Sequence, residues 1–123
     1  MKIKLAQLVN SDGALGRLIE ERLPARLSFT LASVVRVITP RIQDYNEARL
    51  AILREYGTPN EAGDQYRFPD IEIAKKAWAE MKELEETEVE LADIAPIRLD
   101  ERMLEAIQIT PQDVLALNWL LQL

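Results

Sequence analysis

The stretch from Pro24 to Tyr56 constrains the fold more than any other part of the chain, because its 33 residues contain no glycine and carry one apolar stripe. As a helix it would span about 50 Å, at roughly 1.5 Å per residue. A compact protein of 123 residues has a diameter of only about 35 Å. One end of the helix should therefore extend beyond the protein body, where something else must cover its apolar stripe.

The apolar stripe is continuous when residues are placed at intervals of about 100° around the helix. In the first half, Phe29, Ala32 and Val37 add apolar surface on other sides, so we expect that half to be buried nearly all round. The second half is amphipathic and should project as an arm. The stripe consists of Leu27, Leu31, Val34, Ile38, Ile42, Tyr45, Ile52 and Tyr56.

Pro40 lies in the middle of this stretch. A proline inside a helix removes one backbone hydrogen bond and clashes with the preceding turn. It should therefore kink the helix, or Thr39 should cap a second helix that begins at Pro40. We favour the kink.

The segments after the long helix predict an antiparallel helical hairpin. Residues 58–69 have the glycine, proline and polar content of a loop. Pro69-Asp70 then begins a third helix that runs to about residue 86. Its apolar side should face the long helix as it folds back, so that an arm extends over approximately 41–86. The apolar positions are Ile71, Ala74, Ala77, Trp78, Met81 and Leu84.

Two arginines lie at the apolar stripe of this arm. With a loop centred near Gly63, Arg41 faces Glu85, and we expect this ion pair to fix the register. Arg49 falls inside the stripe. Its stem should pack while its charged end reaches Glu80 or solvent; the alternative is that it anchors an acidic partner.

The two ends of the chain should meet in a small sheet. The first five residues alternate between lysine and apolar side chains, and the acidic segment after the third helix alternates in the same way. Opposite charges then place Lys2 and Lys4 opposite Glu88 and Glu90. A further short strand at 97–99 would belong to the same region.

The remaining segments predict three shorter helices. Ser11-Asp12-Gly13 indicates a turn before a helix over 14–22, and Asp100 should cap a second helix. Thr110-Pro111 should begin an apolar helix that continues to the end of the chain and packs in the core or forms a subunit interface.

The fold class that follows is mainly α (α+β), as a single domain over 1–123. We expect a long kinked helix in an antiparallel hairpin and an apolar C-terminal helix. A sheet of two to three strands should join the N-terminus to residues 88–99.

The composition offers no recognisable catalytic site. Cysteine and histidine are absent, which excludes disulfides, thiolate chemistry and imidazole-based catalysis. The glycines lack the Gly-Lys-Ser/Thr of a phosphate loop, and the acids over 80–93 lack the spacing of a calcium loop. We therefore expect no enzyme, no cofactor and no metal site. A hydrolase that uses two carboxylates remains a third hypothesis.

Charge is divided unevenly along the chain. Residues 1–57 carry nine Lys or Arg against six Asp or Glu, whereas residues 58–123 carry six against fifteen. We favour the interpretation that complementary charges line the intramolecular packing. Nucleic-acid binding is the alternative, which the net charge of -6 disfavours. The arginines that would carry it are Arg17, Arg22, Arg26 and Arg36.

We expect the contact surface for a protein partner to be the end of the arm. Aromatic side chains and an arginine lie together in the loop, where they would form an exposed tip for a partner, although we favour local packing against the hairpin for the two aromatic residues. The arm and the C-terminal helix carry more apolar surface than a small core covers, so a homo-oligomer is also expected. The predicted surface consists of Arg49, Arg54, Tyr56, Tyr66, Arg67 and Phe68.

Several short motifs resemble a family of small uncharacterised bacteriophage proteins. They are KLAQLVN, LPAR, EARLAILREYG, VELADIAPIRL and ITPQDVLAL. Thr39-Pro40 departs from that family, which has Lys and Glu there. The resemblance implies a phage origin and a non-enzymatic protein-interaction module, either a virion assembly accessory or a binder of a host factor. It brings no catalytic residues.

The chain lacks the features of a membrane protein. No run approaches about 18 apolar residues, and the first residues lack the apolar core of a signal peptide. With the resemblance, this predicts a soluble protein of the host cytoplasm or a virion component.

Overall fold

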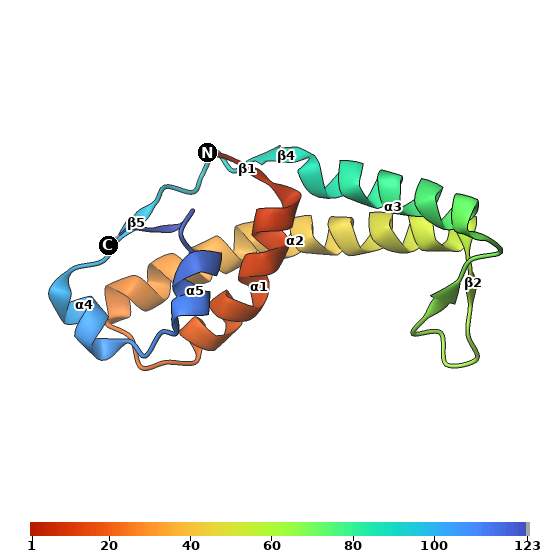
Figure 1. The fold of residues 1–123 in the computed structure, drawn as a ribbon. Coiled ribbons are helices and arrows are strands. Elements are labelled where there is room, and N and C mark those ends of the chain that lie inside the picture. Colours follow the sequence, from red (N-terminus) through yellow and green to blue (C-terminus); the bar gives the residue numbers. More distant parts are fainter. Residues whose placement is uncertain (123) are drawn as a thin grey trace.

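The computed structural model describes residues 1–122 and shows a body from which a two-helix arm projects (Figure 1). The protein is mainly helical with small two-stranded sheets, which confirms the predicted fold class. The helices are α1 (Leu5–Ile19), α2 (Ala25–Tyr56), α3 (Ile71–Glu86), α4 (Glu101–Ala106) and α5 (Pro111–Ala116). The strands are β1 (Lys2–Lys4), β2 (Thr58–Pro59), β3 (Tyr66–Arg67), β4 (Glu88–Glu90), β5 (Ile97–Arg98) and β6 (Leu121–Gln122).

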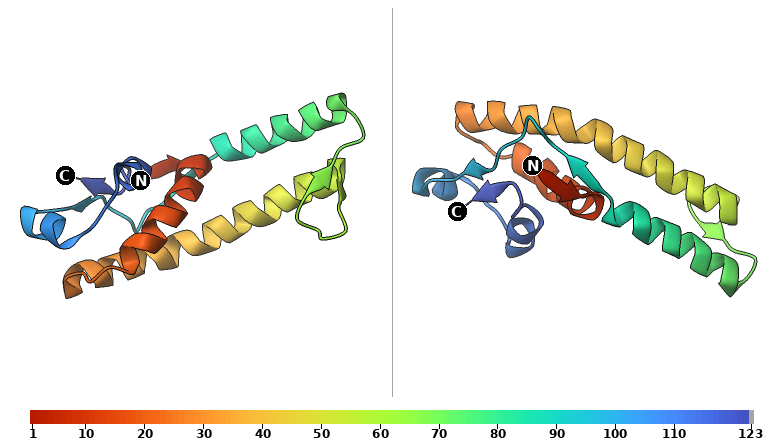
Figure 2. Two further views of the ribbon diagram at one scale, coloured as in Figure 1. Left: turned by 60° about the horizontal axis from the view of Figure 1, so that its bottom comes forward. Right: turned by 90° about the horizontal axis from the view of Figure 1, so that it is seen from above.

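The long helix is confirmed as one element, α2, which continues through Pro40. Figure 2 shows it running from the body into the arm without interruption. Pro40 is exposed, so the carbonyl group that loses its hydrogen-bond donor can turn toward water. The buried residues of α2 all belong to the predicted stripe: Leu27, Leu31, Val34, Ile38, Ile42 and Tyr45.

The expectation that the first half of α2 is buried nearly all round is wrong. Phe29 is 73% exposed, Ala32 is exposed and Val37 is only half-buried. Figure 2 shows α2 along one edge of the body, with α1 and α5 on its inner side. One apolar face is therefore covered, and the other apolar residues remain at the surface.

The predicted pairing of the chain start with residues 88–90 is confirmed. β1 and β4 are antiparallel, and two hydrogen bonds extend the pairing at its ends: the Leu5 amide donates to the Thr87 carbonyl oxygen at 2.9 Å, and the Leu91 amide to the Met1 carbonyl oxygen at 2.7 Å. The opposed pairs are Lys2 with Glu90, Ile3 with Val89, and Lys4 with Glu88.

The strand predicted near residue 97 does not join this sheet. β5 instead pairs in parallel with β6 at the C-terminal end of the described chain. The predicted C-terminal helix is correspondingly short, because α5 ends at Ala116 and a turn leads to β6. This path carries Leu117 and Leu120, both 0% exposed, into the core. Packing in the core is thus confirmed for this segment; Leu123 lies outside the described residues.

The helix predicted over 14–22 begins earlier, because α1 runs from Leu5 through the expected turn at Ser11-Asp12-Gly13. Ser11 is 0% exposed, and its hydroxyl donates to the Leu8 carbonyl oxygen at 2.6 Å. The hydroxyl group is therefore satisfied within the helix. Burial of α1 outweighs the local preference of these residues for a turn.

The arm hairpin is confirmed, with a different register. Asp70 caps α3 by accepting a hydrogen bond from the Ile73 amide at 2.9 Å. The predicted Arg41–Glu85 ion pair is absent from residues 1–122. Glu85 instead accepts a hydrogen bond from the Tyr45 hydroxyl at 3.2 Å, one helical turn along α2 from the expected position.

The core lies in the body, between α1, the inner face of α2 and the C-terminal segments. Only α2 among these elements continues beyond it (Figure 1). The buried apolar residues are Ile3, Leu5, Leu8, Ala14, Leu15, Leu18, Leu27, Leu31, Val34, Ile38, Ile42, Tyr45, Leu91, Ile94, Leu99, Ile107, Leu117, Leu120 and Leu121.

Charge reversal tests the β1–β4 register. Lys4→Glu or Glu88→Lys alone should lower the free energy of unfolding by about 0.2–1 kcal/mol, because like charges then face each other across the strands. The double variant should recover most of this loss in urea unfolding. If the two losses simply add, Lys4 and Glu88 do not interact. Lys82→Glu, at an exposed position of α3, is the matched control.

Candidate functional site

The end of the arm is a small hairpin held by its own backbone. β2 and β3 pair antiparallel, and Asn60 organises the turn between them. Its amide donates to the Gln65 carbonyl oxygen at 2.9 Å, and its side-chain oxygen accepts from the Asp64 amide at 3.2 Å. Gly63 takes a φ of 74°, a conformation that glycine adopts without strain. The arm therefore ends in an ordered turn.

Two of the six predicted contact residues are brought together. Arg49 of α2 and Tyr66 of β3 line an open groove of about 370 Å³ between the helix and the hairpin. Arg49 is exposed and forms no ion pair within residues 1–122. Arg54 and Arg67 are exposed outside this groove. The other lining residues are Leu50, Leu53, Gly63, Asp64 and Gln65.

The other two predicted residues hold the arm together. The Tyr56 hydroxyl donates to the Glu80 carboxylate at 2.8 Å, which raises the pKa of Tyr56 above its usual value. Phe68 is half-buried beside Gly57. Tyr66 is half-buried as well. The two loop rings therefore do not form an exposed aromatic tip, and the structure gives them the local packing that we favoured.

Trp78 of α3 is the most exposed aromatic residue of the arm, although helical spacing predicts that it faces the inside of the hairpin. Trp78 is 52% exposed, and Ile71, seven residues before it on α3, is 57% exposed. Positions seven apart lie on one face of a helix. Ala74 and Ala77 are the buried residues of α3, so the two helices approach through small side chains and leave Trp78 outside. Helical spacing marked this apolar face but not which part of it would be covered.

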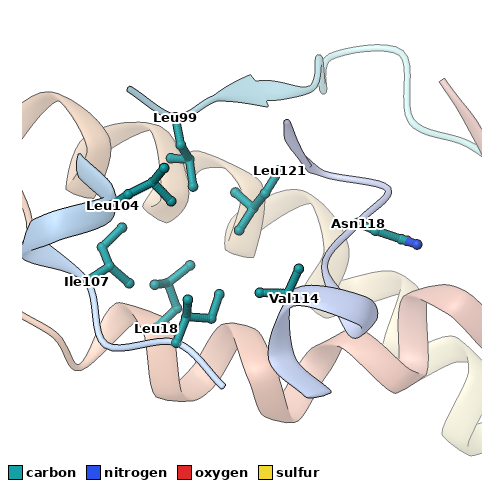
Figure 3. A pocket seen from close by; sticks show the side chains of 8 residues that line it. Leu18, Leu99, Leu104, Ile107, Val114, Asn118 and Leu121 are labelled. Carbon is teal, nitrogen blue, oxygen red and sulfur yellow. The ribbon is translucent and has the colours of Figure 1, made fainter. Parts of the chain in front are cut away.

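An apolar cavity lies in the body, away from the arm. Its volume is about 270 Å³, and it opens between α1, α4, α5 and β6. Figure 3 shows aliphatic side chains converging on it while the Asn118 amide turns away. No titratable group lines it, so it offers no acid–base chemistry. The lining consists of Leu18, Leu99, Leu104, Ile107, Ile109, Val114, Asn118 and Leu121.

Titratable groups gather in a polar cleft beside this cavity. The Arg17 guanidinium forms an ion pair with Asp113, and its Nε donates to a carboxylate oxygen of Asp113 at 3.4 Å. This hydrogen bond is the main reason why the pKa of Asp113 lies below its usual value. A carboxyl held ionised in this way is not suited to donate a proton, as one acid of a two-carboxylate hydrolase must. Glu20 and Glu21 line the same cleft.

Nucleic-acid binding, the alternative function, would depend on four arginines. One of them, Arg17, already has its charge balanced by Asp113. Arg22, Arg26 and Arg36 are exposed.

Within residues 1–122, no cluster of three or more acidic side chains has a geometry that would hold a metal ion. Within the same range, no helix combines the length and the apolar character needed to cross a bilayer. Comparisons with protein-family models, curated proteins and solved structures found no match.

The tight contact at Gly57 can be tested against a glycine in open space. A Cβ at Gly57 would lie 3.1 Å from the Leu53 carbonyl oxygen and 3.2 Å from Phe68 Cε1. Gly57→Ala should therefore cost about 1–3 kcal/mol in the free energy of unfolding. At Gly16, inside α1, an added Cβ would meet no atom within 4 Å apart from its chain neighbours and its own helix backbone. Gly16→Ala should therefore stabilise by about 0.5–1 kcal/mol. Equal stabilisation by both variants would contradict the packing of Phe68.

The Arg17–Asp113 ion pair predicts a pH dependence. A carboxyl whose pKa is lowered by folding stabilises the protein above its unfolded pKa of about 3.9 and loses this contribution as the pH falls through the lower folded pKa. Asp113→Asn should therefore reduce stability at neutral pH and flatten its decline in acid, measured by urea unfolding at several pH values. The exposed Asp93, changed to Asn, is the control. Parallel curves for wild type and Asp113→Asn would contradict the assignment.

Proposed function

We propose that this protein is a non-enzymatic interaction module of a bacteriophage, either a virion assembly accessory or a binder of a host factor, and that its arm carries the contact surface. The observation that carries the proposal is the exposure of Trp78, at 52%, on an arm that projects from the body (Figure 1). Tryptophan is among the residues that most often dominate the energy of protein interfaces.

The chemistry of the arm favours a protein partner over a small molecule. A large aromatic ring and Ile71 share one face of α3, and covering them would remove apolar surface from water. Arg49, in the groove at the end of the arm, adds a charged group of the kind found at interface centres and rims. The phage assignment rests on the resemblance of the KLAQLVN, LPAR and EARLAILREYG motifs.

Affinity capture from lysates of phage-infected bacteria, followed by mass spectrometry, tests the proposal. A partner enriched by the wild-type protein should be reduced about tenfold or more by Trp78→Ala, the loss typical of an interface anchor. Arg49→Ala should weaken capture to a smaller extent. Both positions are exposed, so neither change removes a buried side chain.

Leu115 provides the matched control, because it is 71% exposed on α5 in the body. Leu115→Ala should capture the partner as the wild type does. Equal capture by Trp78→Ala, or loss with Leu115→Ala alone, would contradict an interface on the arm. Circular dichroism of each variant confirms that the helices are retained.

A further inference from the structure

The apolar cavity in the body is enclosed by side chains that are themselves mostly buried. Leu18, Leu99 and Leu121 come from three separate segments, and each is at most 8% exposed. Figure 3 shows Leu104 of α4 and Val114 of α5 pointing into the same space. Leu104 is 37% exposed, so the cavity reaches the surface beside α4. It is a chamber inside the body with a mouth at this short helix.

We propose that this cavity binds an uncharged, hydrocarbon-like small molecule of about ten non-hydrogen atoms. An apolar cavity of about 150 Å³ stays dry and binds benzene. At the same ratio of volume to atoms, the cavity of about 270 Å³ holds about ten non-hydrogen atoms. Each carbon that enters leaves water for an aliphatic environment, which favours binding. Volume and lining together define this class of ligand.

The charges around the cavity disfavour a fatty-acid anion. Within residues 1–122 no ionisable side chain contributes to the lining, so a charge brought inside would have no partner. Ile107 and Ile109 also line the polar cleft beside the cavity. In addition to the ion pair described above, this cleft contains Glu20 and Glu21, which form no ion pair in the described part of the chain. An anionic head group would therefore meet like charge there.

A route into the cavity lies beside α4. None of the six residues of this helix is buried. An element with few buried contacts opens at a low cost in free energy. Outward movement of α4 would widen the mouth at Leu104 and leave the packing of α1 against α2 in place. A molecule of about ten non-hydrogen atoms can enter in this way.

The cavity is separate from the proposed interaction surface. It lies in the body, whereas Arg49 of α2 and Trp78 of α3 lie on the arm (Figure 1). Ligand binding and partner capture are therefore measured on different variants. Failure of either proposal would leave the other untouched.

Straight-chain alcohols from 1-hexanol to 1-undecanol, titrated by two-dimensional NMR, test the size and the chemistry of the ligand. The affinity should rise about fourfold with each added methylene and level off near 1-nonanol, when the cavity is full. Octanoate should bind about tenfold or more weakly than 1-octanol, because its carboxylate is charged. No binding of 1-octanol, a rise that continues unchanged to 1-undecanol, or equal binding of octanoate would overturn the proposal.

Val114→Phe tests the location, because Val114 lines the cavity from α5. The larger side chain should take up part of the volume, weaken 1-octanol binding about tenfold and move the point of levelling to shorter alcohols. Leu115→Phe is the matched control, since Leu115 is the next residue of α5, is 71% exposed and lies outside the lining. Unchanged binding by Val114→Phe, or equal loss with Leu115→Phe, would contradict the location.

Leu104→Ala provides the opposite change, so that a folding defect in Val114→Phe cannot decide the outcome. Removing part of this side chain enlarges the cavity at its mouth. The point of levelling should therefore move to alcohols that are longer by about two carbons. A shift toward shorter alcohols, or none, would show that the alcohols bind elsewhere.

Discussion

The apolar stripe of α2 is the interaction on which the rest of the structure depends. It follows one side of a helix that runs from Ala25 to Tyr56 and is longer than the body. The body covers its first half with α1 and the C-terminal segments, and α3 covers part of its second half. Because Pro40 faces solvent, the lost backbone hydrogen bond leaves the stripe unbroken. The division into body and arm follows from this one continuous surface.

Strand pairing at both ends of the described chain holds the small body against α2. β1 pairs with β4, and β5 pairs with β6, so both ends of the described chain are tied to the segment that follows α3. The ion pair of Arg17 with the buried Asp113 adds a link between α1 and α5. These contacts cover the inner face of α2 and leave its outer face, with Phe29, in solvent.

Local signals predicted much of this fold. Helical periodicity gave α2, the caps at Asp70, Asp100 and Thr110 gave the starts of three helices, and charge alternation gave the β1–β4 register. Tertiary packing decided the rest. Periodicity marks an apolar face without saying what covers it, and for this reason the exposure of Phe29 and Trp78 was missed. The sequence predicted that Arg49 and Tyr66 lie on the same arm. It did not predict that they line one groove, because the groove depends on how the β2–β3 hairpin folds against α2.

A distance between spin labels at positions 26 and 54 of α2 tests the central claim most directly. Arg26 and Arg54 are exposed and can be changed to cysteine in a chain that has none, with unlabelled protein added to dilute contacts between copies. A continuous helix predicts a narrow distribution centred at about 42 Å, at roughly 1.5 Å per residue. A broad distribution, or one centred well below this distance, would show that α2 breaks inside the body and that no arm projects from it.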